Sequence, residues 1–337
     1  AALLEVLDPA QNDTFNDRYV DLPFDLSQVF WIVTANDLGN IPRALRDRME
    51  VLTLSSYTEQ EKEEIAKRYL LPRQRRENGL SDRALTLGPG VIAKIISAYT
   101  REAGVRELER RIGQICRRAA RAVVEEGKTT IKVTVRQLED YLGRPKFLRT
   151  RGMEEPMVGV ATGMAWTEAG GDILPTEVNV FKGRGKLILT GKLGDVMQES
   201  AQAALSYIRS RAREFHLPDA FYEKLDIHIH LPEGAVPKDG PSAGITMATA
   251  MISALTHKKV RRDVAMTGEI TLRGRVLPIG GLKEKALAAY REGISTILLP
   301  KENARDIEEL PESVRCKLRF IPVENMDEVL RHVWEPA

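Results

Sequence analysis

The sequence predicts a multidomain α/β protein, and three observations carry this prediction. The chain has 337 residues, of which 43% are hydrophobic and 29% charged, which is enough for two or three domains with well-formed cores. Residues 58–142 follow a mostly helical pattern. Residues 157–337 interleave strand-like and helix-like segments, as in folds whose helices cover a sheet. A Pro/Gly/Arg-rich connector over 143–156 separates these two regions.

Residues 1–56 are expected to form short helices and strands. Segment 1–7 opens as a short helix without a basic leader, so we expect no signal peptide there. The apolar segment 29–34, Val-Phe-Trp-Ile-Val-Thr, predicts a buried β-strand that ends at Ala35 and Asn36.

The elements of the later regions follow from hydrophobic periodicity. Helices are predicted over 58–76, 89–101 and 105–126, followed by a short strand at 130–134 and a helix from Val135. In the last region we expect an amphipathic helix over 194–215, an apolar helix over 245–255, a strand at 263–267 and a glycine-led helix after Gly281.

Composition favours a soluble enzyme over a membrane protein or a polyanion-binding protein. The 50 basic and 48 acidic groups leave a net charge of only +2. No apolar run reaches the roughly 20 residues that span a bilayer. Cys116 and Cys316 fall in different predicted domains, which suits a reducing compartment and indicates neither a disulfide framework nor a metal site.

A candidate nucleophile lies in segment 237–244, Pro-Lys-Asp-Gly-Pro-Ser-Ala-Gly, where a turn becomes a helix. The first backbone N–H groups of a helix are free to stabilise an oxyanion beside Ser242. A serine at such a place is more commonly an N-cap, and this alternative stays open. No Ser/His/Asp spacing is evident, but Lys283 and Lys285 on the later glycine-led helix provide candidate bases. Helical periodicity does not choose between these two lysines.

His228 and His230 alternate with isoleucines, which places both imidazoles on one strand face with Asp226. Glu233 and Asp239 are near in sequence, so this group could suggest a metal site. We expect no metal, because catalytic zinc needs a third well-placed ligand. The alternative is a polar sheet face.

Five motifs together carry a resemblance to a known family. They are 226–230 (Asp-Ile-His-Ile-His), 237–244, 266–269 (Met-Thr-Gly-Glu), 272–274 (Leu-Arg-Gly) and 278–285 (Pro-Ile-Gly-Gly-Leu-Lys-Glu-Lys). The chain resembles, over nearly its whole length, the C-terminal part of Lon, the ATP-dependent AAA+ protease of bacteria and mitochondria. The resemblance implies a serine endopeptidase in which Ser242 is the nucleophile and Lys285 the base.

The resemblance also implies supporting residues near this Ser–Lys dyad. Thr267 would orient the lysine, Glu177 would hold it in place, and Asp239 would regulate access to the nucleophile. His228 and His230 would lie close to the site without binding a metal.

The same resemblance divides the chain into the end of an AAA+ large domain (1–56), a helical AAA+ lid (57–142), a linker (143–156) and an α+β proteolytic domain (157–337). It implies nucleotide-sensing roles for Asn36 as sensor 1, Arg48 as an arginine finger and Arg106 as sensor 2.

One departure from the family pattern concerns ATP. The sequence contains no Gly-x-x-x-x-Gly-Lys-Ser/Thr loop and no strand ending in Asp-Glu. We therefore expect a truncated chain that keeps peptidase activity without ATPase activity. Peptide hydrolysis would need no cofactor, whereas the full-length enzyme would use ATP and Mg²⁺.

The resemblance implies degradation of unfolded or damaged proteins through an acyl-enzyme, in a homohexamer of the bacterial cytoplasm. A mitochondrial location and a membrane partner are disfavoured. Because Lys285 must be neutral to act as a base, we expect activity to rise with pH through one ionisation. Another type of Ser/Lys hydrolase would lack the preceding lid.

The alternative function is a DNA-binding lid module with a latent protease domain. Five arginines on the predicted helix 105–126 suggest it: Arg110, Arg111, Arg117, Arg118 and Arg121. Glutamates on the same helix favour an ordinary solvated surface instead.

Overall fold

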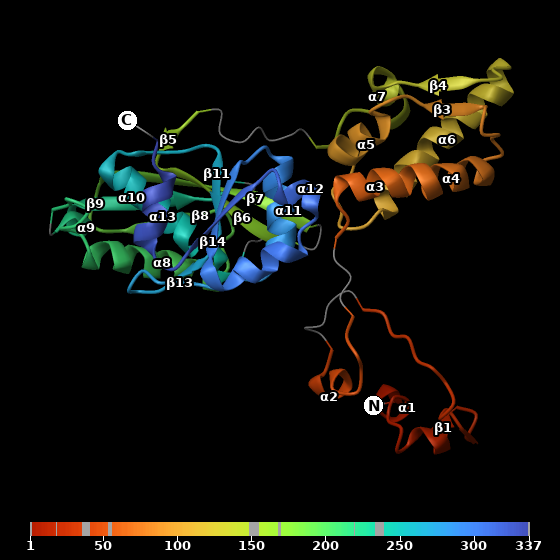
Figure 1. Cartoon of the computed structure of the whole chain (residues 1–337), viewed down its shortest axis with the longest axis horizontal. Coiled ribbons are helices and arrows are strands. Elements are labelled where there is room, and N and C mark those ends of the chain that lie inside the picture. The colour runs from red at the N-terminus through yellow and green to blue at the C-terminus, as the bar shows by residue number, and fades with distance from the viewer. Residues whose placement is uncertain are drawn as a thin grey trace. The chain divides into compact units, whose positions relative to one another are not determined.

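The structure is a computed structural model that describes residues 2–17, 19–35, 41–52, 56–147, 155–167, 170–218, 220–232 and 239–335. The chain divides into two compact units, Ala1–Ser55 and Ser56–Ala337. Helices and strands are interleaved along the chain, which confirms the mixed α/β class (Figure 1).

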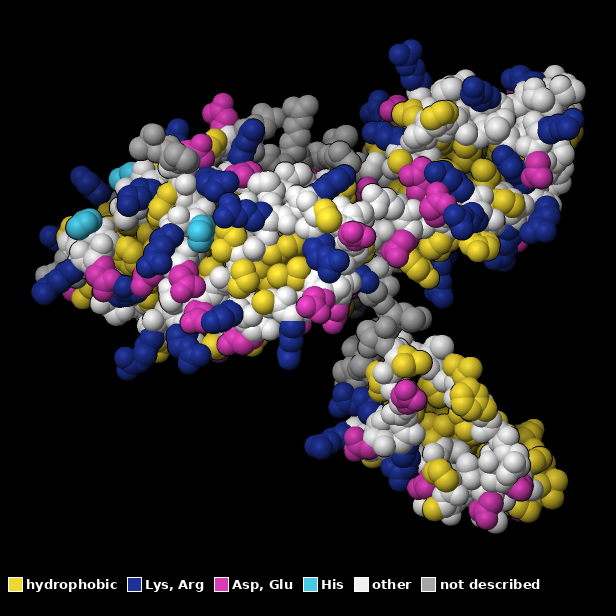
Figure 2. Space-filling view, in the orientation of Figure 1, with side chains coloured by type: hydrophobic (Ala, Val, Ile, Leu, Met, Phe, Trp, Pro, Cys, Tyr) yellow, Lys and Arg dark blue, Asp and Glu magenta, His cyan; other side chains and the backbone are white. Residues whose placement is uncertain are grey.

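The N-terminal unit consists of short elements with little core. Its strands pair as one antiparallel hairpin, and among its described residues only Val6 and Asn12 are buried. Hydrophobic side chains occupy much of its visible surface in Figure 2. Its elements are α1 (Ala2–Val6), a 3-10 turn (Asn12–Thr14), β1 (Phe15–Asp17), β2 (Leu22–Phe24) and α2 (Arg43–Arg46).

The predicted buried strand over 29–34 is wrong. This segment has no strand conformation, and its side chains are exposed, with 88% of Phe30 and 79% of Ile32 accessible. A strand needs a neighbour to bond its N–H and C=O groups, but β1 and β2 pair only with each other in the described part of this unit. Asn36, at the predicted tip, lies outside the described residues.

The second unit begins with a helical region. The long predicted helix from 58 is confirmed as α3, a π-helical turn and α4 in direct succession, and Thr58 starts it with a capping box to Glu61. The helices and strands of this region share one hydrophobic core, which includes the fully buried Leu85, Ile95 and Leu108. Its elements are α3 (Glu59–Ile65), the π turn (Ala66–Leu70), α4 (Leu71–Glu77), β3 (Leu85–Leu87), α5 (Val91–Tyr99), α6 (Arg106–Glu126), β4 (Ile131–Val133), a 3-10 turn (Val135–Gln137) and α7 (Leu138–Leu142).

A seven-stranded mixed sheet forms the centre of the region after residue 155. Its order is β15-β14-β11-β6-β7-β9-β8. The first four strands run parallel, β7 is antiparallel to both β6 and β9, and β8 is parallel to β9. The strands are β6 (Val160–Thr167), β7 (Gly170–Lys182), β8 (Leu187–Thr190), β9 (Leu225–His230), β11 (Val264–Met266), β14 (Thr296–Pro300) and β15 (Arg319–Val323).

Helices cover both faces of this sheet. Along β7, Leu174 packs in the core that contains α8 (Asp195–Ser210), α10 (Gly244–Thr256) and α13 (Met326–Val333). Its neighbour Ile173 packs in the other core, which contains α11 (Leu282–Arg291). Because successive strand residues point to opposite faces, α10 and α11 lie on opposite sides of the sheet.

Smaller elements complete this region. They are β5 (Met157–Val158), α9 (Phe221–Lys224), a 3-10 turn (Pro241–Ala243), β10 (Lys259–Val260), β12 (Glu269–Ile270), β13 (Val276–Leu277), a 3-10 segment (Lys301–Glu309) and α12 (Glu312–Arg315). None of the helices in the described ranges combines the length and the apolar character needed to cross a membrane.

Candidate active site

Ser242 lies in the 3-10 turn that leads into α10. The backbone around it is fixed, because its carbonyl accepts the Gly268 N–H at 2.8 Å and the Thr267 hydroxyl at 3.3 Å. The side chain is half-buried, and within the described residues its Oγ makes no hydrogen bond. Ser242 therefore does not cap α10, which disfavours the structural alternative for this serine.

Position 268 leaves little room for a side chain. A Cβ there would lie 2.7 Å from Cγ1 of Val276 and 3.1 Å from Cδ1 of Ile245. Gly268 also accepts the Ile245 N–H at 3.1 Å while it donates to Ser242. The two hydrogen bonds join the segment after β11 to the start of α10 and place Thr267 beside Ser242.

Lys285 approaches the same point from the opposite face of the sheet. It lies in the first turns of α11 with only 2% of its surface exposed, and Nζ donates to Thr267 Oγ1 at 3.2 Å. Since Thr267 Oγ1 is 3.3 Å from the Ser242 carbonyl oxygen, Nζ is no further than 6.5 Å from that oxygen (3.2 plus 3.3 Å). Lys283, the other candidate base, is half-buried. Geometry thus distinguishes the two lysines where periodicity did not.

Burial changes the acidity of this amine. Desolvation lowers the pKa of Lys285 from 10.5 to about 8, while the Glu284 carboxylate opposes the shift. Such a shift corresponds to about 3 kcal/mol of destabilisation of the ammonium form relative to the free amine. A buried lysine of this kind is suited to accept a proton near neutral pH.

Thr267 is the residue that connects the two candidates. It follows β11 directly, is fully buried, and its N–H donates to the Leu298 carbonyl at 3.1 Å. Its hydroxyl donates to the Ser242 carbonyl and accepts from Lys285 Nζ. The structure therefore brings Ser242, Thr267 and Lys285 together just beyond the end of β11.

Asp239 lies in the turn before Ser242 and contacts α8. Its Oδ1 accepts the Met197 N–H at 3.2 Å and the Gly240 N–H at 2.9 Å. A Cβ on Gly194 would come within 2.4–2.7 Å of this carboxylate, so glycine leaves room for it. Asp239 thereby caps α8 from a distant part of the chain, where a negative charge is favourable.

Glu177 and the two histidines lie further along the sheet. Glu177 is exposed on β7 and is the register partner of His230, and no ion pair joins it to Lys285 within the described ranges. Contacts of the described residues thus give no support to a role for Glu177 in holding the lysine. His228 Nε2 and His230 Nδ1 converge on Thr190 Oγ1, at 2.9 and 2.7 Å.

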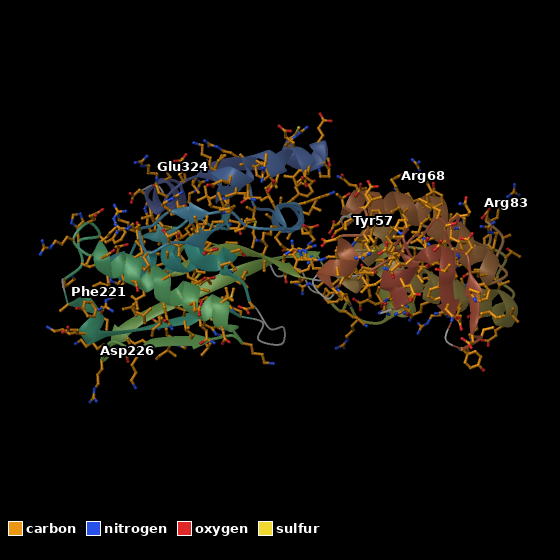
Figure 3. The ribbon with its side chains drawn as sticks, turned by 90° about the horizontal axis from the view of Figure 1, so that it is seen from below. Tyr57, Arg68, Arg83, Phe221, Asp226 and Glu324 are labelled. Carbon is orange, nitrogen blue, oxygen red and sulfur yellow. The ribbon has the colours of Figure 1, made fainter. Side chains whose placement is uncertain are left out.

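A metal is not supported at these histidines. The described residues contain no cluster of three or more His, Cys, Asp or Glu side chains arranged to hold one, and Glu233 lies outside them. Asp226, labelled beside Phe221 at one end of the sheet in Figure 3, accepts the N–H groups of Arg184 and Lys186 instead of facing a metal. The backbone bonds lower the pKa of the Asp226 carboxyl.

Two of the residues assigned to nucleotide sensing are described by the structure, Arg48 in the N-terminal unit and Arg106 in the second unit. Arg48 forms an ion pair with Asp8 at 3.1 Å and donates to the Ala44 carbonyl at 2.8 Å, so it is held within its own unit. Arg106 is exposed at the first residue of α6, where the helix dipole disfavours a cation. Its position is therefore not explained by stabilisation of α6. Asn36 is outside the described part of the chain.

The arginines of α6 are mostly engaged by neighbours on the helical region. Arg110 and Arg111 pair with Glu107, and Arg121 pairs with Glu125 at 2.8 Å. Arg118 donates to the Asp140 carbonyl. These contacts favour a solvated helix surface over a DNA-binding face.

Thr190 and Gly194 are site neighbours that sequence reasoning missed. Thr190 joins the histidines only because β8 pairs in parallel with β9, in the register Thr190 to His230. Gly194 accommodates Asp239, which lies more than forty residues later in the chain. No local sequence signal reports either contact.

Two family models match the chain. The Lon protease (S16) C-terminal proteolytic domain matches residues 132–335, and the Lon protease AAA+ ATPase lid domain matches residues 76–132. The first match covers more than half of the chain.

Curated relatives agree with these matches. Lon protease 1 of Myxococcus xanthus is 57% identical over 331 residues, and Lon protease 1 of Bacillus subtilis is 59% identical over 332 residues. Each alignment covers 98% of this chain but only 40% and 43% of the two relatives. The chain therefore spans about two fifths of the length of these relatives. From the two domain matches and this identity, we conclude that the chain belongs to the Lon protease family and contains the proteolytic domain of that family.

Proposed function

We propose that this chain is a serine endopeptidase that uses Ser242 as the nucleophile and Lys285 as the general base. The observation that carries this proposal is the buried Lys285 amine, which is hydrogen-bonded to the same Thr267 hydroxyl that contacts Ser242. A serine paired with a lysine is an established alternative to the serine–histidine pair.

The mechanism follows from the neutral amine. Lys285 Nζ accepts the Ser242 Oγ proton as Oγ attacks the substrate carbonyl, and it returns a proton to the leaving amine. Water then hydrolyses the acyl-enzyme with Lys285 acting again as the base. Backbone N–H groups at the start of α10 are the proposed stabilisers of the oxyanion. Ser242 Oγ and Lys285 Nζ share no direct hydrogen bond here, and such contacts commonly tighten when substrate binds.

Three alanine variants test the assignment on a fluorogenic unstructured peptide. We expect Ser242→Ala and Lys285→Ala to lose nearly all activity, at least about a thousandfold, since residues of a catalytic unit are each required. Lys283→Ala, two residues away on the same helix, is the matched control and should stay within about twofold. Circular dichroism must show that all three are folded. Substantial turnover by either of the first two variants would refute the dyad.

A pH profile provides an independent arm of this test. With a Lys285 pKa of about 8, roughly a tenth of the amine is neutral at pH 7 and roughly nine tenths at pH 9. We expect kcat/KM to rise through a single ionisation near pH 8 and then to level off. A flat profile from pH 6 to 10, with chemistry shown to be rate-limiting, would contradict a lysine base.

The wider function is proposed from the family. We infer that the substrates are unfolded or damaged proteins and peptides, that the full-length enzyme is a homohexamer driven by ATP and Mg²⁺, and that it acts in the bacterial cytoplasm. We infer that this chain does not form a complete nucleotide site, because its 337 residues contain no phosphate-binding loop. No step of the proposed peptide hydrolysis passes through ATP, and we expect no ATPase activity from this chain.

A further inference from the structure

Gly171, near the start of β7, lies against the backbone of α11 at the position of Lys285. A Cβ built on Gly171 would be 1.9 Å from the Glu284 carbonyl oxygen, 2.3 Å from its carbon and 2.9 Å from the Lys285 nitrogen. All three atoms belong to the helix backbone, so no side chain can move aside to make room. Only the absence of a side chain at 171 lets α11 come this close to the sheet.

The backbone conformation of Gly171 does not itself require glycine. Its neighbour Gly170 has φ of +117°, which favours glycine, but Gly171 is not among the residues with positive φ. Gly171 pairs with Trp166 in the regular register of β6 and β7. The contact with α11 is therefore the reason that a side chain is excluded at this position.

Trp166 supports the same helix from the neighbouring strand. As cross-strand partners, Trp166 and Gly171 share one face of the sheet, the face covered by α11. A Cβ on Gly281, which precedes α11, would lie 3.1–3.3 Å from the Trp166 side chain. The first turn of α11 thus lies against the large side chain of Trp166 and against Gly171, which has no side chain.

A third contact fixes the other end of the helix to the same residue. The Gly171 carbonyl accepts a hydrogen bond from Arg291 Nη2 at 3.1 Å, and Arg291 is the last residue of α11. Gly171 therefore contacts both the first turn of α11, at Glu284, and its last residue, Arg291.

We propose that Gly171 is a positioning residue for Lys285, and that Gly171 and Trp166 together form a seat that sets how close α11 lies to the sheet. This inference rests on the proposed function of Lys285. The seat acts through the helix backbone and touches no substrate.

The expected effect of filling the seat follows from distances. An ordinary contact between a methyl carbon and a carbonyl oxygen is about 3.5 Å, so a Cβ at 1.9 Å must push α11 outward by more than about 1 Å. The Lys285 to Thr267 hydrogen bond is already 3.2 Å long, near the limit for such bonds. A displacement of this size would break it, and misplacing a catalytic group by about 1 Å can cost about a hundredfold in rate.

The titration of Lys285 should report the displacement. Moving α11 outward would admit water to Nζ and raise the pKa of Lys285 toward its ordinary value. Among the described residues, Glu284 supplies the charge that acts on this amine, and Thr267 on the facing segment is neutral. A rise would therefore indicate restored solvation of the lysine.

Gly171→Ala tests the proposal in the whole chain, with Gly280→Ala as the matched control. Gly280 also lies just before α11, has no positive φ and has nothing within 4 Å of a built Cβ. We expect Gly171→Ala to lower kcat at pH 8 by ten- to a hundredfold, to change KM less than about threefold, and to move the acid limb of the pH profile upward by at least about half a unit. Gly280→Ala should match the wild type in all three.

Trp166→Ala decides the question if Gly171→Ala does not fold. This substitution removes the indole ring beside the start of α11 without introducing a clash. We expect kcat to fall by about three- to tenfold, with the same upward shift of the acid limb of the pH profile. Folding of each variant is checked by its thermal melting curve. If Gly171→Ala folds and keeps the wild-type kcat and pH profile, the proposal is overturned. If Gly171→Ala does not fold, a wild-type kcat and pH profile in Trp166→Ala overturns it. An active Lys285→Ala variant would instead refute the proposed function on which the inference rests.

Discussion

Lys285 illustrates a conflict between stability and function in a single side chain. Its amine is buried, and the pKa is lowered to about 8 because burial disfavours the ammonium. A protein selected only for stability would replace such a lysine with an apolar residue of similar length. Its presence in the core beneath Thr267 is easiest to explain by a requirement for a neutral amine at that point.

Lys285→Met is expected to stabilise the fold in a pH-dependent way. Below about pH 8 the buried lysine is charged in both folded and unfolded chains, and its desolvation costs about 3 kcal/mol. Between pH 8 and 10.5 the folded state loses the proton first, so the cost declines and vanishes above the unfolded pKa. We expect Lys285→Met to raise the free energy of unfolding by up to about 3 kcal/mol at pH 7 and by much less at pH 10.5.

Denaturant unfolding at the two pH values measures this difference. Lys283→Met is the control, since the neighbouring position is half-buried, and its effect should not depend on pH in the same way. A Lys285→Met variant that is less stable than the wild type at pH 7 would show that the hydrogen bond to Thr267 outweighs the desolvation of the amine.

At this scale the sequence indicated part of the site. Ser242 could be singled out because a polar residue between glycines and an apolar helix is conspicuous in one dimension. The choice of Lys285 over Lys283 needed either the resemblance or the burial of the side chain. Gly171 was not predicted, because its role depends on an α11 backbone more than a hundred residues away.

At the scale of elements, α8 depends on a cap that it does not supply itself. Its first position is preceded by Gly194, which has no side chain to bond the exposed N–H groups, and Asp239 bonds Met197 in its place. This contact connects the start of a core helix to the turn that holds Ser242. A substitution that weakens this contact is therefore expected to destabilise both the start of α8 and the turn that holds Ser242.

Gly194→Ala and Asp239→Ala are expected to be non-additive. Gly194 has extended backbone angles, φ −69° and ψ 171°, so alanine causes no backbone strain. The added Cβ would instead collide with the Asp239 carboxylate at 2.4–2.7 Å and remove the cap. Each single variant should cost about 1 kcal/mol, and Gly194→Ala should cost distinctly less in the Asp239→Ala background. A double-mutant cycle of unfolding free energies measures the coupling. Equal costs of Gly194→Ala in both backgrounds would contradict the cap.

Elements with strong periodicity were predicted well, and the reason is physical. The helices of 58–126 carry apolar faces and, at Thr58, a complete capping box, so local signals agree with the final packing. Segment 29–34 has an equally strong apolar signal, yet it forms no strand. Strand formation depends on a neighbouring chain segment, which composition alone cannot report.

At the scale of the whole molecule, the order of the strands in the sheet could not be predicted from the sequence. The sheet places β11 between β6 and β14 and reverses direction at β7, and the pairing of β11 with β6 joins segments about a hundred residues apart. The consequence for the site is direct. Ser242, in the turn before α10, and Lys285 on α11 approach from opposite faces of the sheet, and both contact Thr267, which follows the strand between them.

The two units are also expected to differ in resistance to proteolysis. Among described residues before 53, only Val6 and Asn12 are buried, whereas the second unit contains extensive apolar cores. Few buried contacts mean that local opening costs little free energy. Trypsin should therefore cut first at sites such as Arg43 and Arg46, which lie in this unit.

The product of that cleavage should keep its peptidase activity, because Ser242, Thr267 and Lys285 all belong to the second unit. Mass spectrometry of a trypsin time course identifies the first cuts, and the peptide assay, run after trypsin is inhibited, follows activity in the same samples. Digesting Ser242→Ala in parallel separates trypsin cuts from self-cleavage. If kcat/KM fell in step with loss of residues before 56, the N-terminal unit would have to support the active site directly. First cuts within the seven-stranded sheet would show that its apolar cores do not confer the protection expected of them.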